Sequence, residues 1–189
     1  MINRRTALAG VAGMFGASLF APLARAAGAP RGVEIPAISD GPPSVRVFTP
    51  IQRAAMSALS DRVIPTTDTP GAIAAGVPDF IEKMLADWAL PGDRVPITAG
   101  LDAIEARSMG DYGVPAANAT PEQQDALLTL AMNQQLPGAE GFFEPFRQLV
   151  ITGYYTSEIG MTQEREYLPV PGEYNGEFLY SQVNKVYSA

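Results

Sequence analysis

The stretch GFFEPFRQLVITGYYTS, residues 141–157, is the most apolar of the helical patterns in this chain. Its phenylalanines, aliphatic residues and two tyrosines recur at a spacing that predicts a helix. We expect this helix to be the central element of the fold. Tyr154 and Tyr155 are adjacent, and adjacent side chains point about 100° apart on a helix. They can hardly share one core layer, so we expect one of them to face a partner or a groove.

Two segments carry the same helix-start signal. Thr49-Pro50-Ile51-Gln52 and Thr120-Pro121-Glu122-Gln123 each combine an N-cap hydroxyl, a proline at the first helical position and a glutamine that can close a capping box. The first start predicts a helix that ends before Pro65, with an apolar face of Ile51, Ala55, Leu59 and Val63. The second predicts a helix that ends by Pro137-Gly138.

Two more helices are expected between these starts. One begins at Pro78, and the other is capped by Thr98 and runs to about Met109, with Leu101, Ile104 and Met109 facing inward. Pro91-Gly92-Asp93 is predicted to be a turn. Together the patterns predict an all-α fold, a compact bundle of about five helices with long irregular loops and an extended C-terminal tail.

The composition excludes several kinds of chemistry. The chain has neither cysteine nor histidine, which removes disulfides, thiolate nucleophiles, Ser-His-Asp triads and histidine-bound zinc. A formal net charge of -7 argues against nucleic acid, because binding there depends on basic side chains. A carboxylate pair or an oxygen-ligated cation is what remains.

Acidic residues are therefore the only candidates for catalysis or metal binding. Seven of them flank the central helix or lie around the loop at 63–81: Asp61, Asp68, Asp79, Asp87, Glu140, Glu144 and Glu158. Carboxylates at helix ends are usually solvated or capping. The stretch Thr66-Thr67-Asp68-Thr69-Pro70-Gly71 lacks the spaced acids of a calcium loop, and no phosphate-binding glycine motif occurs in the sequence. We predict no catalytic, cofactor-binding or metal site in this chain.

The N-terminus has the layout of an export signal. Arg4 and Arg5 precede an apolar stretch, and Ala24-Arg25-Ala26 forms an A-x-A cleavage site. The paired arginines indicate twin-arginine (Tat) export, which carries folded proteins, with general secretion as the alternative. We expect a signal peptide at 1–26, an extended tether at 27–48 and one helical domain at 49–189, with a wrapping tail from about 160.

Two further segments suit contact with another protein. The loop VIPTTDTPGAIAAGVPDFI, residues 63–81, is rigid and polar, and the tail after Gly160 is rich in tyrosine but has no helical or strand period. Together with the end of the central helix, they give the predicted partner-binding residues Thr66, Thr67, Asp68, Thr69, Pro70, Gly71, Gly153, Tyr154, Tyr155, Ser157, Tyr167, Pro169, Pro171, Tyr174 and Tyr180.

Several of these stretches together resemble the gluconate 2-dehydrogenase subunit 3 family. They are IPTTDTPGAIAAGVPDFI, FFEPFRQLVITGYYTSEIGM and YLPVPGEYNG, behind the paired-arginine leader. The resemblance covers roughly residues 49–176. It implies a non-catalytic small subunit that binds a FAD-dependent large subunit of the glucose-methanol-choline type, which oxidises a sugar or polyol.

The resemblance also implies what this subunit does for its partner. It assists folding of the large subunit and supplies the Tat signal for export of both to the periplasm, where the complex is membrane-associated and includes a cytochrome c subunit where one is present. FAD is then expected in the large subunit and no cofactor in this chain. Two alternatives stay open, a small periplasmic hydrolase or lyase built on carboxylates, and a stand-alone periplasmic binding domain.

Overall fold

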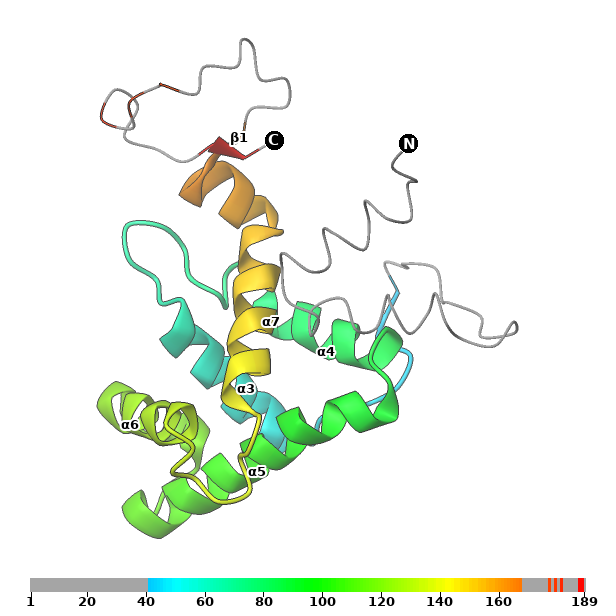
Figure 1. Ribbon diagram of the computed structural model, residues 1–189, viewed down its shortest axis with the longest axis vertical. Coiled ribbons are helices and arrows are strands. Elements are labelled where there is room, and N and C mark those ends of the chain that lie inside the picture. The colour runs from blue at the N-terminus through cyan, green and yellow to red at the C-terminus, as the bar shows by residue number, and fades with distance from the viewer. Residues whose placement is uncertain (1–40, 168–176, 178, 180, 182–186, 189) are drawn as a thin grey trace.

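Five α-helices form the body of the part of the chain that the structure, a computed structural model, describes (Figure 1). That part comprises residues 41–167, 177, 179, 181, 187 and 188. The α-helices are α3 (Pro50–Val63), α4 (Val77–Asp87), α5 (Pro91–Tyr112), α6 (Pro121–Met132) and α7 (Phe143–Tyr155). Shorter elements are the 3-10 turn η1 (Ala116–Asn118), the π-helical turn η2 (Gly160–Glu164), and the strands β1 (Glu166–Tyr167) and β2 (Tyr187–Ser188), which pair in parallel.

The helix α7 lies at the centre, as its apolar sequence predicts. It contacts each of α3, α4, α5 and α6, and Figure 1 shows it running through the middle of the body. Phe146, Val150 and Tyr154 are buried along its length. Phe142, just before the helix, stacks on Phe146 with ring centroids 5.1 Å apart. The all-α bundle is therefore confirmed.

Both threonine-proline starts form the expected capping boxes. At α3 the Thr49 hydroxyl accepts a hydrogen bond from the backbone N–H of Gln52 at 3.2 Å, and the side-chain carbonyl of Gln52 accepts one from the Thr49 N–H at 2.9 Å. Thr120 and Gln123 make the same reciprocal pair at the start of α6. Because each box satisfies N–H groups that the first turn leaves free, short local sequence fixes where these helices begin.

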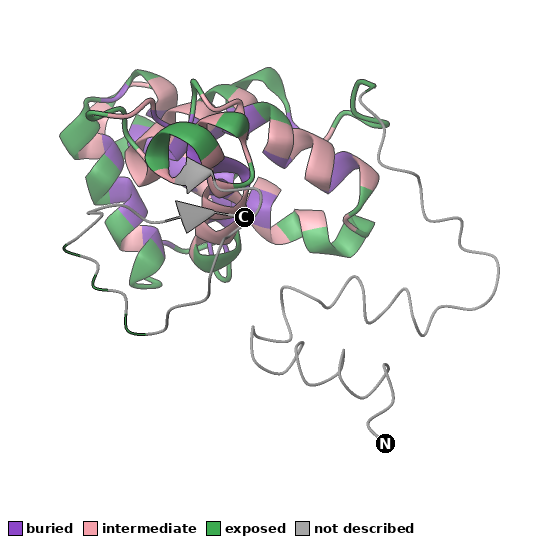
Figure 2. Cartoon of the chain, turned by 90° about the horizontal axis from the view of Figure 1, so that it is seen from above, coloured by how far each residue is buried: buried purple, intermediate pink, exposed green. Residues whose placement is uncertain are grey.

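The buried side of α3 differs from the predicted face. Ala55 and Leu59 are fully buried, but Ile51 is 59% exposed and Gln52 is only 8% exposed. The Gln52 side chain is held inside because its amide donates to Asp102 on α5 at 2.7 Å. The buried stripe thus starts at a polar residue one position later than expected, which apolar spacing alone could not show. Figure 2 shows the buried residues gathered on the inward sides of the helices.

The helix α5 begins earlier than predicted. Pro91-Gly92-Asp93 forms its first turn rather than a separate turn, and Pro96 lies inside the helix. Thr98 does not cap it, since its hydroxyl donates to the carbonyls of Arg94 and Val95 within the helix. Pro91 takes the first helical position, where the N–H has no intrahelical acceptor, whereas Pro96 lies beyond the first turn, where a proline removes a backbone hydrogen bond. Leu101 and Ile104 are fully buried as expected, whereas Met109, in the last turn of α5, is 48% exposed.

The described end of the predicted tether lies against the body. Residues 41–44 make hydrogen bonds to α4, and Phe48 is 3% exposed. The predicted signal peptide and residues 27–40 fall outside the described residues. Among the helices that the structure describes, none has the length and apolar character needed to cross a membrane.

Candidate partner-binding surface

The threonine loop, residues 66–71, closes tightly on itself between α3 and α4. A Cβ atom added at Gly71 would lie 2.6 Å from the backbone nitrogen of Thr66, so only glycine fits there. The Gly71 N–H donates to the Thr66 hydroxyl at 3.0 Å, and the Thr67 N–H donates to the Thr69 carbonyl at 3.0 Å. The loop's own polar groups therefore hold its shape.

The tip of this loop presents polar groups outward. Thr66, Thr67 and Asp68 are exposed. The Thr67 hydroxyl donates to the Asp68 carboxylate at 2.9 Å. This hydrogen bond, followed by backbone N–H donors, holds the pKa of Asp68 below its ordinary value. The tip is thus a fixed anionic point on the surface at neutral pH.

The end of α7 supports the loop from inside. A Cβ at Gly153 would lie 2.6 Å from the Phe80 ring, so the glycine lets α7 and α4 approach closely. Tyr154 is 1% exposed, and its hydroxyl donates to the Pro70 carbonyl at 2.8 Å. A buried tyrosine hydroxyl needs such a partner, so Tyr154 ties the loop to the central helix.

A second tie comes from the segment after α7. The Thr69 hydroxyl donates to the Glu164 carboxylate at 2.6 Å. The Arg165 guanidinium lies over the Tyr155 ring at 4.5 Å, a cation–π contact. Ser157 links α7 to η2, because its hydroxyl donates to the Tyr154 carbonyl and accepts from the Gly160 N–H. The turn η2 thus lies against both the loop and the helix end.

The structure brings together two of the three segments predicted to bind a partner. The threonine loop and the end of α7 form one surface with η2, which we call the loop–helix surface and define as residues 66–71, 153–157 and 160–165 (Figure 1). Within it Gly153 and Tyr154 are buried, and of the two tyrosines Tyr155 is the one that is partly exposed.

The third segment is mostly undescribed. Tyr167 lies in β1, while Pro169, Pro171, Tyr174 and Tyr180 fall outside the described residues, as do the predicted export residues Arg4, Arg5, Ala24 and Ala26. Their roles stay predictions.

Sequence reasoning missed three residues of this region. The Phe80 ring packs against Gly153, the Glu164 carboxylate accepts a hydrogen bond from the Thr69 hydroxyl, and the Arg165 guanidinium lies over the Tyr155 ring. The glycine in an otherwise apolar helix signals a close approach, although it does not say to what. Glu164 and Thr69 are 95 residues apart in sequence, and no local pattern connects them.

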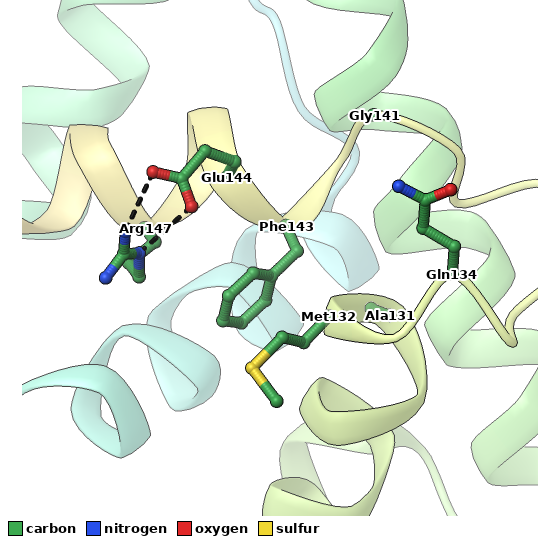
Figure 3. Close-up of a pocket in the computed structure, with 7 residues that line it drawn as sticks. All are labelled: Ala131, Met132, Gln134, Gly141, Phe143, Glu144 and Arg147. Atoms are coloured by element: carbon green, nitrogen blue, oxygen red, sulfur yellow. Dashed lines mark hydrogen bonds and ion pairs between the residues drawn. The ribbon is translucent and has the colours of Figure 1, made fainter.

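A separate hollow of about 540 Å³ lies between the end of α6 and the start of α7 (Figure 3). Met132 and Phe143 form its apolar side. Glu144 and Arg147 pair at its edge at 2.8 Å. This ion pair and the Gln148 amide hold the pKa of Glu144 below its ordinary value. The hollow has an apolar wall and a charge-paired rim.

Every carboxylate of the described residues that shows a shifted pKa has its pKa lowered. Asp68, Asp87, Glu122, Asp125 and Glu144 each have a lowered pKa, because hydrogen-bond donors favour the charged form. A general acid at neutral pH requires the opposite shift, so these five groups do not suit that role. Within the described ranges, no three acidic side chains are grouped as a metal site requires.

Comparison with known proteins identifies a family. A family model described as Gluconate 2-dehydrogenase subunit 3 matches residues 50–172, which is more than half of the chain. The matched range contains the whole loop–helix surface. No curated protein and no solved structure matches the chain.

Proposed function

This chain belongs to the gluconate 2-dehydrogenase subunit 3 family, and on that premise we propose that it is a non-catalytic accessory subunit of a dehydrogenase complex. Its partner is a FAD-dependent large subunit of the glucose-methanol-choline type that oxidises a sugar or polyol. The chain assists folding of that subunit and carries the Tat signal that exports both to the periplasm. FAD resides in the large subunit, and the complex is membrane-associated, with a cytochrome c subunit where one is present.

The chemistry of this chain supports an accessory role. It has no histidine or cysteine, and the carboxylates with shifted pKa values are held ionised by their donors. Oxidation of a sugar alcohol needs a group that accepts a hydride, which protein side chains do not supply and FAD does. The large subunit is therefore the natural place for the reaction.

We propose that the large subunit binds at the loop–helix surface. The observation behind this is the set of contacts that hold the loop in one shape. The loop is closed by Gly71, tied to α7 through Tyr154 and tied to η2 through Glu164. A loop already held in one shape loses little conformational entropy when it binds. Exposed Thr66, Thr67 and Asp68 can then meet donors on the large subunit.

Affinity purification from the native host tests the accessory role. The tagged chain is isolated from periplasm and membranes, and flavin absorbance and dye-linked sugar oxidation are measured on what accompanies it. We expect a stoichiometric flavoprotein whose soluble, active form disappears when this chain is deleted. A chain that purifies alone and colourless would contradict the proposal.

Matched charge changes test where the large subunit binds. Thr67→Arg changes the exposed loop tip, and we expect it to weaken co-purification by at least about tenfold. The new cation lies beside Asp68, where it repels the donors that the large subunit would present to this carboxylate. Val95→Arg introduces the same charge at a residue of α5 that is 57% exposed and should have little effect. If Val95→Arg disrupts the complex and Thr67→Arg does not, the interface lies elsewhere.

A further inference from the structure

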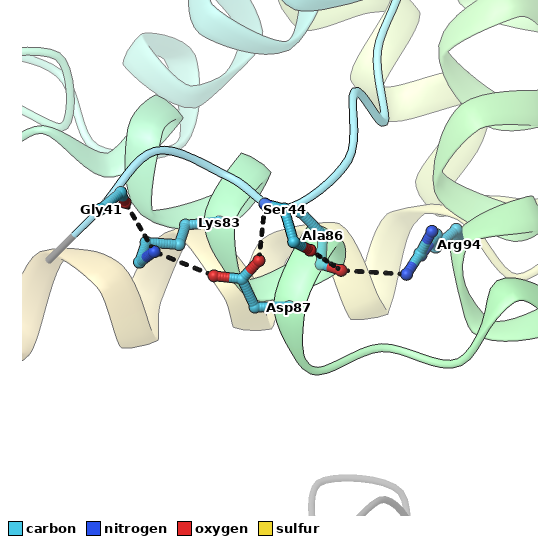
Figure 4. A network of polar contacts seen from close by, with 6 residues as sticks. All are labelled: Gly41, Ser44, Lys83, Ala86, Asp87 and Arg94. Carbon is cyan, nitrogen blue, oxygen red and sulfur yellow. Dashed lines mark hydrogen bonds and ion pairs between the residues drawn. The ribbon is translucent and has the colours of Figure 1, made fainter. Parts of the chain in front are cut away.

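The helix α4 holds the backbone of the segment that precedes the helical body (Figure 4). The Lys83 ammonium donates to the Gly41 carbonyl at 2.8 Å, and the Ser44 N–H donates to the Asp87 carboxylate at 2.8 Å. Lys83 and Asp87 also pair with each other at 2.9 Å, one turn apart on α4. The two charged side chains thus face the segment as one preformed unit.

The segment is suited to being held in this way. Pro42 and Pro43 lie between its two points of contact. Consecutive prolines have no N–H and favour a stiff, extended backbone. The two contacts involve backbone groups of Gly41 and Ser44, so they depend on the backbone conformation of the segment and not on its side chains. Holding a stiff segment costs less conformational entropy than holding a flexible one.

The same contacts involve α5. The Ala86 carbonyl, in the last turn of α4, accepts from the Ser44 hydroxyl at 3.1 Å and from Arg94 of α5 at 3.0 Å. The same Arg94 nitrogen donates to the Ala89 carbonyl at 3.0 Å. Carbonyls in the last turn of a helix lack intrahelical donors, and here the segment and α5 supply them. The segment is therefore bound at the corner where α4 meets α5.

We propose that Lys83, Asp87 and the Ala86 carbonyl form a clamp that fixes the root of the N-terminal segment to the folded body and releases it when α4 and α5 unpack. The bonds join residues 42 or 43 positions apart in sequence, so they are tertiary contacts between the segment and α4. What the clamp does for export rests on the proposed function: the predicted leader is then held at a fixed point on a folded subunit.

The composition of the chain offers a direct reporter for the clamp. Trp88 is the single tryptophan, it follows Asp87, and the chain has no cysteine. A bimane label on Val45→Cys, next to Ser44, is quenched by tryptophan at short range. Val45 is 43% exposed, so the label does not displace core residues. The experiment uses the full chain.

We expect strong quenching in the labelled parent under native conditions. Most of that quenching should be lost in Asp87→Asn, and all of it should be retained in Asp111→Asn. Ser44→Ala removes only the hydrogen bond to the Ala86 carbonyl and keeps both backbone contacts, so it should lose a smaller, measurable part. The control is matched because Asp111 also pairs with a cation one turn away, Arg107. Ser44→Ala lies outside the helices, so it stays informative if Asp87→Asn fails to fold. Equal quenching in all four proteins would overturn the clamp.

Denaturant titration of the parent tests the link to folding. Loss of quenching should coincide with loss of helical circular dichroism, because the clamp needs packed α4 and α5. Loss of quenching at clearly lower denaturant would overturn the coupling. The label reports only contact within this chain, so failure here counts against the clamp, whereas failure of co-purification counts against the accessory role.

Discussion

Gly153 has no side chain where α7 packs against Phe80 of α4, and the close contact of the two helices there depends on this. The Phe80 ring fills the space that a side chain would occupy. The next residue, Tyr154, is buried and reaches the Pro70 carbonyl. A single small residue therefore sets how closely α7 holds the threonine loop.

We expect Gly153→Ala to destabilise the protein by about 1–3 kcal/mol, because its Cβ would lie 2.6 Å from the Phe80 ring and force it to move. Gly110→Ala, inside α5, is the matched control. No atom lies within 4 Å of its added Cβ, so it should be neutral or stabilise by up to about 1 kcal/mol. Urea unfolding of both variants measures the difference. Equal stabilities would show that the packing at Gly153 is looser than described.

Capping boxes decide where α3 and α6 begin, and they belong to the scale of the element. We expect Thr49→Ala to lower the free energy of unfolding by about 1 kcal/mol, because it leaves the Gln52 N–H without its acceptor. Thr49→Ser should keep most of the stability. Thr129→Ala removes a hydroxyl that donates to a carbonyl within α6, and it should cost less. Urea unfolding that gives equal losses for Thr49→Ala and Thr129→Ala would contradict the importance of the cap.

The contact between α4 and the N-terminal segment should depend on acid. Lys83, followed by the Ser44 donors, lowers the pKa of Asp87 from 3.8 to about 2. The pKa of Asp87 is lower in the folded chain than in the unfolded one, so ionised Asp87 stabilises the fold fully at pH values above 3.8. This stabilisation is lost as the pH falls toward about 2. We expect quenching of the Val45→Cys label to fall in that window while helical circular dichroism reports on the body. Asp87→Asn, which cannot titrate, should show no such step before the body unfolds.

The elements show which features could be predicted from sequence. The starts of α3 and α6 could, because four consecutive residues contain the whole capping signal. The start of α5 could not, since Gly92 and Pro96 oppose a helix locally and Arg94 is engaged with carbonyls at the end of α4. Likewise, the buried Gln52 depends on Asp102, 50 residues away. Local chemistry is readable, and long-range polar contacts are not.

At the scale of the whole molecule, part of the predicted partner-binding site is buried and connects the threonine loop to α7. The sequence of the threonine loop predicts a rigid, polar segment, and the hydrogen bonds within the loop hold it in one shape. The adjacency of Tyr154 and Tyr155 indicates that one of them faces outward, but it does not show which one. Tyr154 lies inside, and the surface available to a partner consists of the loop tip and the neighbourhood of Tyr155.

The proposed export of two proteins on one leader makes the strongest demand on the whole molecule. Arg4→Lys with Arg5→Lys preserves the positive charge that general secretion requires but removes the arginine pair that indicates Tat export. We expect this double variant to leave both this chain and its flavoprotein in the cytoplasm, measured by dye-linked sugar oxidation in separated periplasmic and cytoplasmic fractions. Arg25→Lys makes the same exchange beside the cleavage site and should leave export unchanged. A flavoprotein that reaches the periplasm normally in the double variant has another route, and the leader would then serve this chain alone or act through general secretion, which tolerates lysine.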